Sequence, residues 1–430
     1  MRKPGRIAVS VLAFSTYLSL LAFAPGCDKR ITPPHVPPPN LLAPVSASAR
    51  VAVYVDASGS IAGYVRQRDA SEFIQTMRAL RPAIEHGWEF SPYQFSTDIS
   101  PISRFPEDLE RADFFRGLQT NIESALAYRD SADVKVVVTD LFESSAYVDT
   151  IAKLLEQNCV SKGLALGIIG VKSSFEGRVF GVGIQRTTFR YPFLPAQPVR
   201  RPFYILILGK HRDVQRYAEN VLRFLPFGND QSVIQGPLLL SPWVTEEDTV
   251  KPAIAYVRPL PKKVQFRAAT TDAFTFRILD GEQKTIQVRF PYERLRGVAT
   301  AGRPRARVER VEEWSDRGLA LCGDPGRLFE AVPVEHDDEG FVAFGLRIHT
   351  DQLGEKRVYR VSVVAEVDEK SITLPPWVAS WTMNLDSVDY WRAHPEAFNG
   401  ETTQYLNELF QPLAQKFHPV IARLYFDIRR

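Results

Sequence analysis

Five side chains with oxygen atoms lie directly after predicted strands or just before a predicted helix. An α/β sheet positions ligand-binding groups at such places. The pattern D-x-S-x-S over residues 56–60 directly follows the apolar run at 51–55, and the sequence TD at 139–140 follows a second such run. A threonine at position 120 stands just before a predicted helix. Because ligands of open parallel sheets bind beyond the carboxyl ends of the strands, these segments are predicted to meet at one edge. The candidate residues are Asp56, Ser58, Ser60, Thr120 and Asp140.

The chemistry of this set is that of a site for a hard divalent cation. Mg²⁺ prefers near-octahedral oxygen coordination and usually keeps several waters beside a small number of carboxylates. The serines and the threonine supply neutral oxygens, and the aspartates supply charge. If the aspartates act mainly through water, the cation keeps net positive charge and an open position. A carboxylate from a partner protein can fill that position.

In this order, the three segments resemble the metal-ion-dependent adhesion site of von Willebrand factor type A domains. The resemblance covers about residues 50–228 and includes the context GLQTNIESAL around the threonine. It implies direct coordination by Ser58, Ser60 and Thr120, with Asp56 and Asp140 acting largely through water. The implied cation is Mg²⁺, with Mn²⁺ or Ca²⁺ as alternatives. One departure is Leu141, which stands where the family often has glycine.

Other interpretations of these residues stay open. Asp56 and the two serines are also suited to capping the helix that follows, and the domain can keep the pattern without using a metal. A phosphatase of the haloacid-dehalogenase kind needs an aspartate at position 58 as its acid/base, and Ser58 stands there. The sequence contains no GxxxxGK[ST], GxSxG or HExxH motif. The chain is therefore predicted not to be an enzyme.

The elements that must position the site form a predicted doubly wound α/β domain over residues 50–228. Apolar runs near residues 51, 88, 134, 164 and 203 alternate with helical patterns. Continuous apolar runs of this kind are typical of a mostly parallel sheet that is covered by helices on both faces. Residues 172–201 have no helical period and are predicted to form a hairpin insertion.

The pattern changes near residue 232, which predicts a second domain. Residues 232–380 contain alternating and β-branched runs separated by turns, as in an antiparallel β-sandwich. The basic, turn-rich segment 295–310 is predicted to be a solvated loop, with contact to an acidic partner or a lipid surface as the alternative. Residues 381–430 are predicted to form a helical C-terminal segment that packs back on a domain.

The first residues are typical of an export signal. Residues 1–26 combine a basic start with an apolar stretch that ends in small side chains, and an uncleaved membrane anchor is the alternative. The sequence LAFAPGC resembles a bacterial lipobox, which implies that Cys27 carries lipid. Proline-rich residues 27–49 then form a semi-rigid tether. A lipid-anchored location in the bacterial cell envelope follows, facing the periplasm or on the cell surface.

Charge and cysteine content limit the remaining classes. The chain has 53 basic and 50 acidic residues, and three of the basic ones lie in the signal segment, so the rest is balanced. A balanced chain gives no electrostatic reason to expect a nucleic-acid partner. Besides Cys27, the chain has Cys159 and Cys322, which form either one disulfide or two buried thiols.

Taken together, these features predict a membrane-tethered, divalent-cation-dependent module that binds a protein ligand through a carboxylate. Its role is adhesion or the assembly of an envelope complex. The alternative is a structural or scaffolding envelope lipoprotein whose α/β domain does not use metal.

Overall fold

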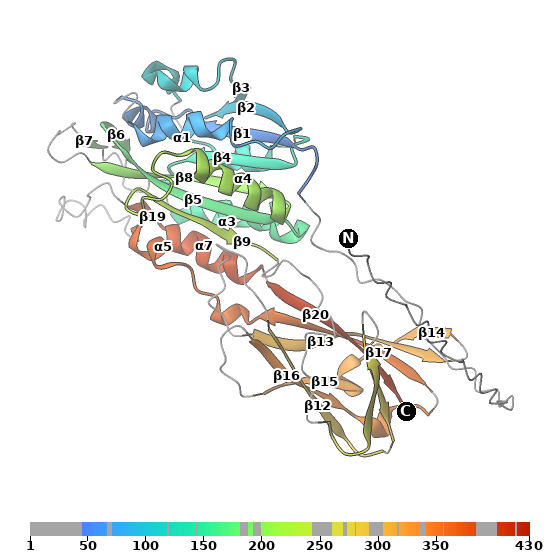
Figure 1. Cartoon of the computed structure of the whole chain (residues 1–430). Coiled ribbons are helices and arrows are strands. Elements are labelled where there is room, and N and C mark those ends of the chain that lie inside the picture. The colour runs from blue at the N-terminus through green and yellow to red at the C-terminus, as the bar shows by residue number, and fades with distance from the viewer. Residues whose placement is uncertain are drawn as a thin grey trace, which may run out of the picture.

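The computed structural model contains two sheet-based parts, with helices from near the C-terminus between them (Figure 1). It describes residues 45–66, 71–117, 120–128, 130–142, 145–180, 188–191, 199–242, 260–269, 273–279, 281–291, 304–315, 318–334, 341–355, 357–383, 402–417 and 419–430. The predicted signal, Cys27 and most of the tether lie outside these residues. Within the described ranges, every helix is too short or too polar to cross a membrane.

The first part is built on a seven-stranded sheet in the order β3-β2-β1-β4-β8-β5-β9. Its strands are β1 (Arg50–Asp56), β2 (Glu89–Phe95), β3 (Ile99–Pro101), β4 (Val134–Thr139), β5 (Ala165–Ser174), β8 (Arg200–Gly209) and β9 (Ile234–Leu240). Strand β1 is an interior strand and pairs in parallel with both β2 and β4. The carboxyl ends of β1 and β4 therefore lie at the same edge, as the sequence predicted.

All other pairs in this sheet are antiparallel, including β2 with β3, so the sheet is mixed and not mostly parallel as predicted. Strand β8 runs antiparallel to both of its neighbours, β4 and β5, and β5 also pairs antiparallel with β9. The reason is the connection between β5 and β8, which is the short hairpin β6 (Gly177–Phe180) and β7 (Thr188–Tyr191). Parallel neighbours need a long crossover connection, usually a helix, and this hairpin does not supply one. The predicted hairpin insertion is thus confirmed, and it reverses β8.

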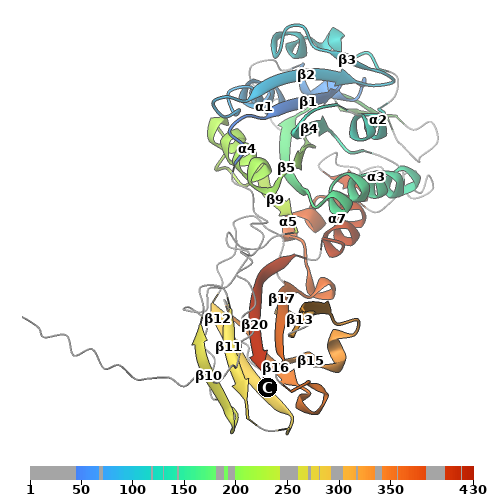
Figure 2. The same cartoon turned by 90° about the vertical axis from the view of Figure 1, so that its right-hand side faces the viewer.

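Helices cover both faces of the seven-stranded sheet (Figure 2). They are α1 (Glu72–Leu80) and α4 (His211–Phe224) on one face, and α2 (Ile122–Ala127) and α3 (Ser145–Asn158) on the other. Successive side chains of a strand point to opposite faces, and β1 shows this directly. Val53 belongs to the buried cluster that includes Met77 and Val221, whereas Tyr54 belongs to the cluster that includes Leu126 and Ile151.

The expected end of the first domain at residue 228 needs correction. Strand β9, at 234–240, completes the sheet, and α5 (Pro376–Ser380), β18 (Thr382–Met383), β19 (Thr403–Gln404) and α7 (Leu406–Gln415) also belong near it. The Tyr204 hydroxyl lies 2.8 Å from the Thr403 hydroxyl, and Lys416 pairs with Glu156 of α3. These late elements cover apolar surface of β5, β8 and β9 that α2 and α3 leave open.

The second part contains a six-stranded sheet, in the order β10-β11-β20-β17-β13-β14, and a three-stranded sheet, in the order β12-β16-β15. The strands are β10 (Val264–Ala269), β11 (Phe274–Ile278), β12 (Lys284–Pro291), β13 (Pro304–Ser315), β14 (Gly318–Leu321), β15 (Phe329–Pro333), β16 (Phe341–Ile348), β17 (Val358–Val367) and β20 (Val420–Arg429). The two sheets share a core, where the rings of Phe344 and Phe426 meet edge to face. One continuous cluster of buried apolar side chains extends from this core to the first part.

The prediction of a helical segment over residues 381–430 is only partly right. Helix α7 is present, but the last ten-residue element is β20, which pairs with β11 and β17 inside the six-stranded sheet. Its alternation is that of a strand buried on one face, because Leu424, Phe426 and Ile428 enter the core while Arg423 and Asp427 make ion pairs.

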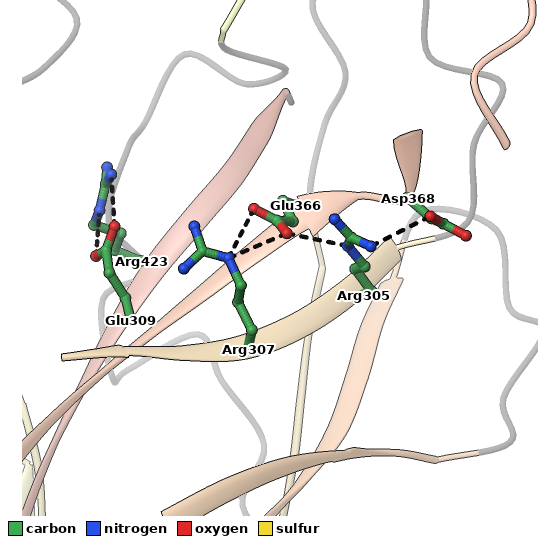
Figure 3. A network of polar contacts seen from close by, with 6 residues as sticks. All are labelled: Arg305, Arg307, Glu309, Glu366, Asp368 and Arg423. Atoms are coloured by element: carbon green, nitrogen blue, oxygen red, sulfur yellow. Dashed lines mark hydrogen bonds and ion pairs between the residues drawn. The ribbon is translucent and has the colours of Figure 1, made fainter. Parts of the chain in front are cut away.

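The basic segment 295–310 also differs from its prediction, because its described part is strand β13 and not a loop. Figure 3 shows that two of its arginines, Arg305 and Arg307, pair with carboxylates of the same chain. Arg305 Nε and Arg307 Nε lie 3.0 and 3.2 Å from Glu366 Oε1, and Arg305 also contacts Asp368 at 3.4 Å. The alternation in PRARVERV presents these charges on one face of the strand.

Two further features bear on the sequence predictions. Cys159 and Cys322 are free thiols, the first buried and the second half-buried, so they do not form a disulfide. Burial raises the pKa of Cys159 to about 12.

At the start of β1, the end of the predicted tether is fixed to α4, because both the backbone N–H and the hydroxyl of Ser46 donate to Asp213 at 2.7 Å.

Candidate functional site

The loop after β1 holds three of the predicted residues close together. The Ser58 backbone N–H donates to Asp56 Oδ1 at 2.8 Å, which folds the loop over the end of the strand. The hydroxyls of Ser58 and Ser60 lie 3.0 Å apart. The short helix η1 (Ile61–Tyr64) begins directly after Ser60, and the Ser60 side chain makes no capping hydrogen bond to it. Helix capping therefore does not account for that serine.

Strand β4 brings the second carboxylate to the first. Val55 of β1 is level with Val138 of β4, and the Thr139 hydroxyl donates to Asp56 Oδ2 at 3.2 Å. Asp56 is fully buried and Asp140 nearly so. Burial, and then repulsion from the Asp140 carboxylate, raise the pKa of Asp56 to about 7. Two buried carboxylates thus lie close enough to repel each other at the carboxyl ends of neighbouring strands.

A buried arginine completes this edge, and the sequence analysis missed it. Arg201 NH2 lies 3.0 Å from Asp140 Oδ2, and Arg201 is only 1% exposed. Its guanidinium carbon lies 4.6 Å from the ring centre of Phe142 and 5.5 Å from that of Phe175. Arg201 is the second residue of β8, and it reaches this edge because β8 is antiparallel to β4. The hairpin predicted for residues 172–201 was the available signal, since it joins antiparallel neighbours.

The segment before α2 is fixed against the loop after β1. Gly117 N–H donates to the Ala57 carbonyl at 3.0 Å, and the Gly117 carbonyl accepts from Gly59 N–H at 2.9 Å. A Cβ at position 117 would lie 2.5 Å from Ser96 Cβ, so this approach requires glycine.

Thr120 follows three residues after Gly117 and is half-buried. Its neighbour Asn121 caps α2, because its side-chain oxygen accepts from Ser124 N–H at 3.0 Å. Among the described residues, Thr120 makes no hydrogen bond to the other four candidates. The structure therefore brings Asp56, Ser58, Ser60 and Asp140 together, and it places Thr120 at the start of the helix where the sequence predicted it.

Leu141, the departure from the family pattern, lies in the turn after β4. This residue has a φ of 48°, a left-handed conformation that glycine adopts most easily, and its side chain is buried. The Leu141 backbone N–H donates to the Thr139 hydroxyl at 3.3 Å, and Phe142 N–H donates to Asp140 Oδ1 at 3.4 Å. The turn thus directs both polar side chains of the TD sequence toward the site.

The donor set has the composition that a hard cation needs. No group of three or more His, Cys, Asp and Glu side chains gathers within the described part of the chain. The candidate ligands at this edge are instead hydroxyls beside two carboxylates, which suits Mg²⁺ better than a softer transition metal. Asp56 accepts hydrogen bonds from the Ser58 backbone N–H and the Thr139 hydroxyl. Both donors are neutral, so neither of them neutralises the charge of the carboxylate.

Comparisons with family models, with curated proteins and with solved structures gave no match to this chain. The functional interpretation therefore depends on the chain's own residues and their geometry.

Proposed function

We propose that this chain is a membrane-tethered module that binds a protein ligand through a divalent cation, in the manner of a von Willebrand factor type A domain. The observation that carries the proposal is the meeting of Asp56, Ser58, Ser60 and Asp140 at the carboxyl ends of β1 and β4. These ends lie at an edge where open α/β sheets bind ligands. The parallel order β2-β1-β4 with helices on both faces supports a doubly wound core, from which β8 departs.

In this proposal the cation is Mg²⁺, or Mn²⁺ or Ca²⁺, and it is held by Ser58, Ser60 and Thr120. The two aspartates act through water and supply the negative charge. Because the direct ligands are neutral, the bound cation keeps net positive charge. A carboxylate of the partner is attracted to it and fills an open coordination position. The role that follows is adhesion, or the assembly of a complex in the bacterial envelope.

One observation favours a second function, that of a scaffolding lipoprotein that does not use metal. The Arg201 guanidinium already neutralises Asp140 in a buried pair, so part of the charge offered to a cation is taken. The rest of the chain offers a reason for such a role, because its two parts share one continuous core.

Calorimetric titration of the full-length chain with Mg²⁺ and Mn²⁺ separates these functions. We expect binding to the natural chain and a weakening of about tenfold or more in Ser58→Ala, because one direct ligand is lost. Ser103→Ala is the matched control, since Ser103 is an exposed serine of the same part. Absence of binding in the natural chain, or equal affinity in Ser58→Ala, would overturn the cation-dependent function.

The tether is tested separately at Cys27. Expressed in a bacterium, the chain is expected to be processed before Cys27 and to partition into detergent, because the residues before it form an export signal with small side chains. Cys27→Ser should block processing, whereas Cys322→Ser should not. Mass spectrometry of the mature N-terminus provides the measurement. A mature protein that begins elsewhere would refute lipidation at this residue.

A further inference from the structure

The buried pair between Arg201 and Asp140 sets the charge of the candidate site. Strand β8 is held at its start, because the Tyr64 hydroxyl donates to the Pro202 carbonyl at 2.7 Å. In the pairing of β5 with β8, Arg201 is level with Ser173, beyond the end of β4. The guanidinium is therefore fixed by its own strand and by the nearby rings of Phe142 and Phe175, and it is only 1% exposed.

We propose that Arg201 is an internal cation that competes with the divalent ion for Asp140 and so weakens metal binding at this site. The inference rests on the proposed function and concerns its regulation. With both carboxylates charged, Asp56, Asp140 and Arg201 carry a net charge of one negative unit; without the arginine, they carry two. A divalent cation that approaches Asp140 meets the field of the guanidinium, whose nearest nitrogen is 3.0 Å from that carboxylate.

The size of the effect follows from the ordinary influence of a neighbouring charge. An opposite charge within hydrogen-bonding reach changes the proton affinity of a carboxylate by about ten- to a thousandfold. A divalent cation interacts with the same field more strongly than a proton does, although at greater distance. Removal of the guanidinium charge should therefore lower the Kd for Mg²⁺ or Mn²⁺ by about tenfold or more.

The experiment compares cation titrations of full-length variants by calorimetry. Arg201→Met removes the charge and keeps an apolar side chain next to Phe142 and Phe175, and the affinity of this variant for the cation should rise. Arg200→Met is the matched control, because Arg200 is the neighbouring arginine, its side chain is 40% exposed, and it pairs with Glu72 at 3.6 Å rather than with Asp140. Its Kd should not change.

A second pair of variants keeps the test decisive even where Arg201→Met folds poorly. Asp140→Asn leaves the guanidinium without its carboxylate, so binding should weaken by about tenfold or more. Asp140→Asn combined with Arg201→Met removes both charges and should regain affinity close to that of the natural chain. A merely structural arginine would not give this recovery.

The outcomes distinguish the two proposals. Binding in the natural chain, with no gain in Arg201→Met and no recovery in the double variant, overturns this inference and leaves the proposed function in place. Binding in Arg201→Met with none in the natural chain supports the inference and overturns cation use by the natural chain. Absence of binding in all of these chains overturns both.

Discussion

Two of the places where arginine pairs with a buried carboxylate differ in the ratio of arginines to buried carboxylates. At the edge of the seven-stranded sheet, Arg201 pairs with Asp140, Asp56 supplies a second carboxylate beside Asp140, and all three side chains are buried. On the six-stranded sheet, Arg305 and Arg307 share the single buried carboxylate Glu366, and these arginines are 43% and 53% exposed (Figure 3).

An ion pair therefore does not by itself mark a functional site. At the exposed network, water and salt screen the charges, and Asp368 supplies a further carboxylate. At the buried edge, Asp56 and Asp140 together carry one more charge than Arg201 when both are ionised. Water screens a buried charge less than an exposed one, and a bound cation would balance this surplus.

The largest expected effect is on stability in the absence of metal. Arg201→Met should lower the free energy of unfolding by about 3–5 kcal/mol, because it leaves Asp140 buried without its partner. Arg307→Met should lower it by less than about 1 kcal/mol, because that arginine is half-exposed and Arg305 still contacts Glu366. Urea unfolding in the presence of a chelator measures both. Similar losses in the two variants would show that burial does not separate the two regions.

The next effect concerns the cation. A ligand that binds only the folded chain raises the free energy of unfolding by about 2.7 kcal/mol at a concentration one hundred times its Kd. We expect Mg²⁺ or Mn²⁺ to raise the melting temperature of the natural chain and of Arg307→Met, but not that of Asp56→Ala. A similar rise in Asp56→Ala would place the bound cation elsewhere in the molecule.

A third expected effect is a loss of stability in acid, caused by the buried His211. Burial lowers the pKa of His211 to about 4, and its Nδ1 lies 2.6 Å from the Ser241 hydroxyl. Between pH 6.5 and 4 the unfolded chain binds a proton at this histidine and the folded chain does not, so acid destabilises the fold in that window. The loss is about 2 kcal/mol at about pH 5 and approaches about 3 kcal/mol below about pH 4.

The measurement for His211 is the free energy of unfolding against pH. His211→Gln should flatten the profile between pH 6.5 and 4, whereas the exposed His86→Gln should leave it as in the natural chain. An unchanged profile in His211→Gln would show that this histidine is protonated in the folded state.

The sequence predicted the parts of the site that depend on local pattern. Apolar runs identified β1 and β4, and two parallel strands must end at the same edge, so Asp56 and Asp140 were placed correctly. The composition of an apolar run does not predict the direction of its strand in the sheet, because a strand buried on both faces has the same composition in either direction. Arg201 was missed for that reason, although the hairpin before it would have reversed β8.

The same limit applies to the fold beyond the first sheet. The alternation in VIARLYFDIR is that of a strand, but the amphipathic stretch before it directed the prediction toward a helical tail. Pairing between segments far apart in the chain decided the outcome, because β20 lies between β11 and β17. Local periodicity predicts that a segment is a strand or a helix. Which strands it pairs with depends on contacts between residues far apart in the sequence.

The attachment of Ser46 to Asp213 has a mechanical consequence. It fixes the tether beside the start of β1, while the candidate site lies at the other end of the same strand. If the tether is held by a membrane and a partner pulls at the site, the force runs along β1. Strands β2 and β4 flank β1 on both sides, so their hydrogen bonds lie across the pull and are loaded together in shear. They cannot open one after another, as they would if the strand were peeled from an edge.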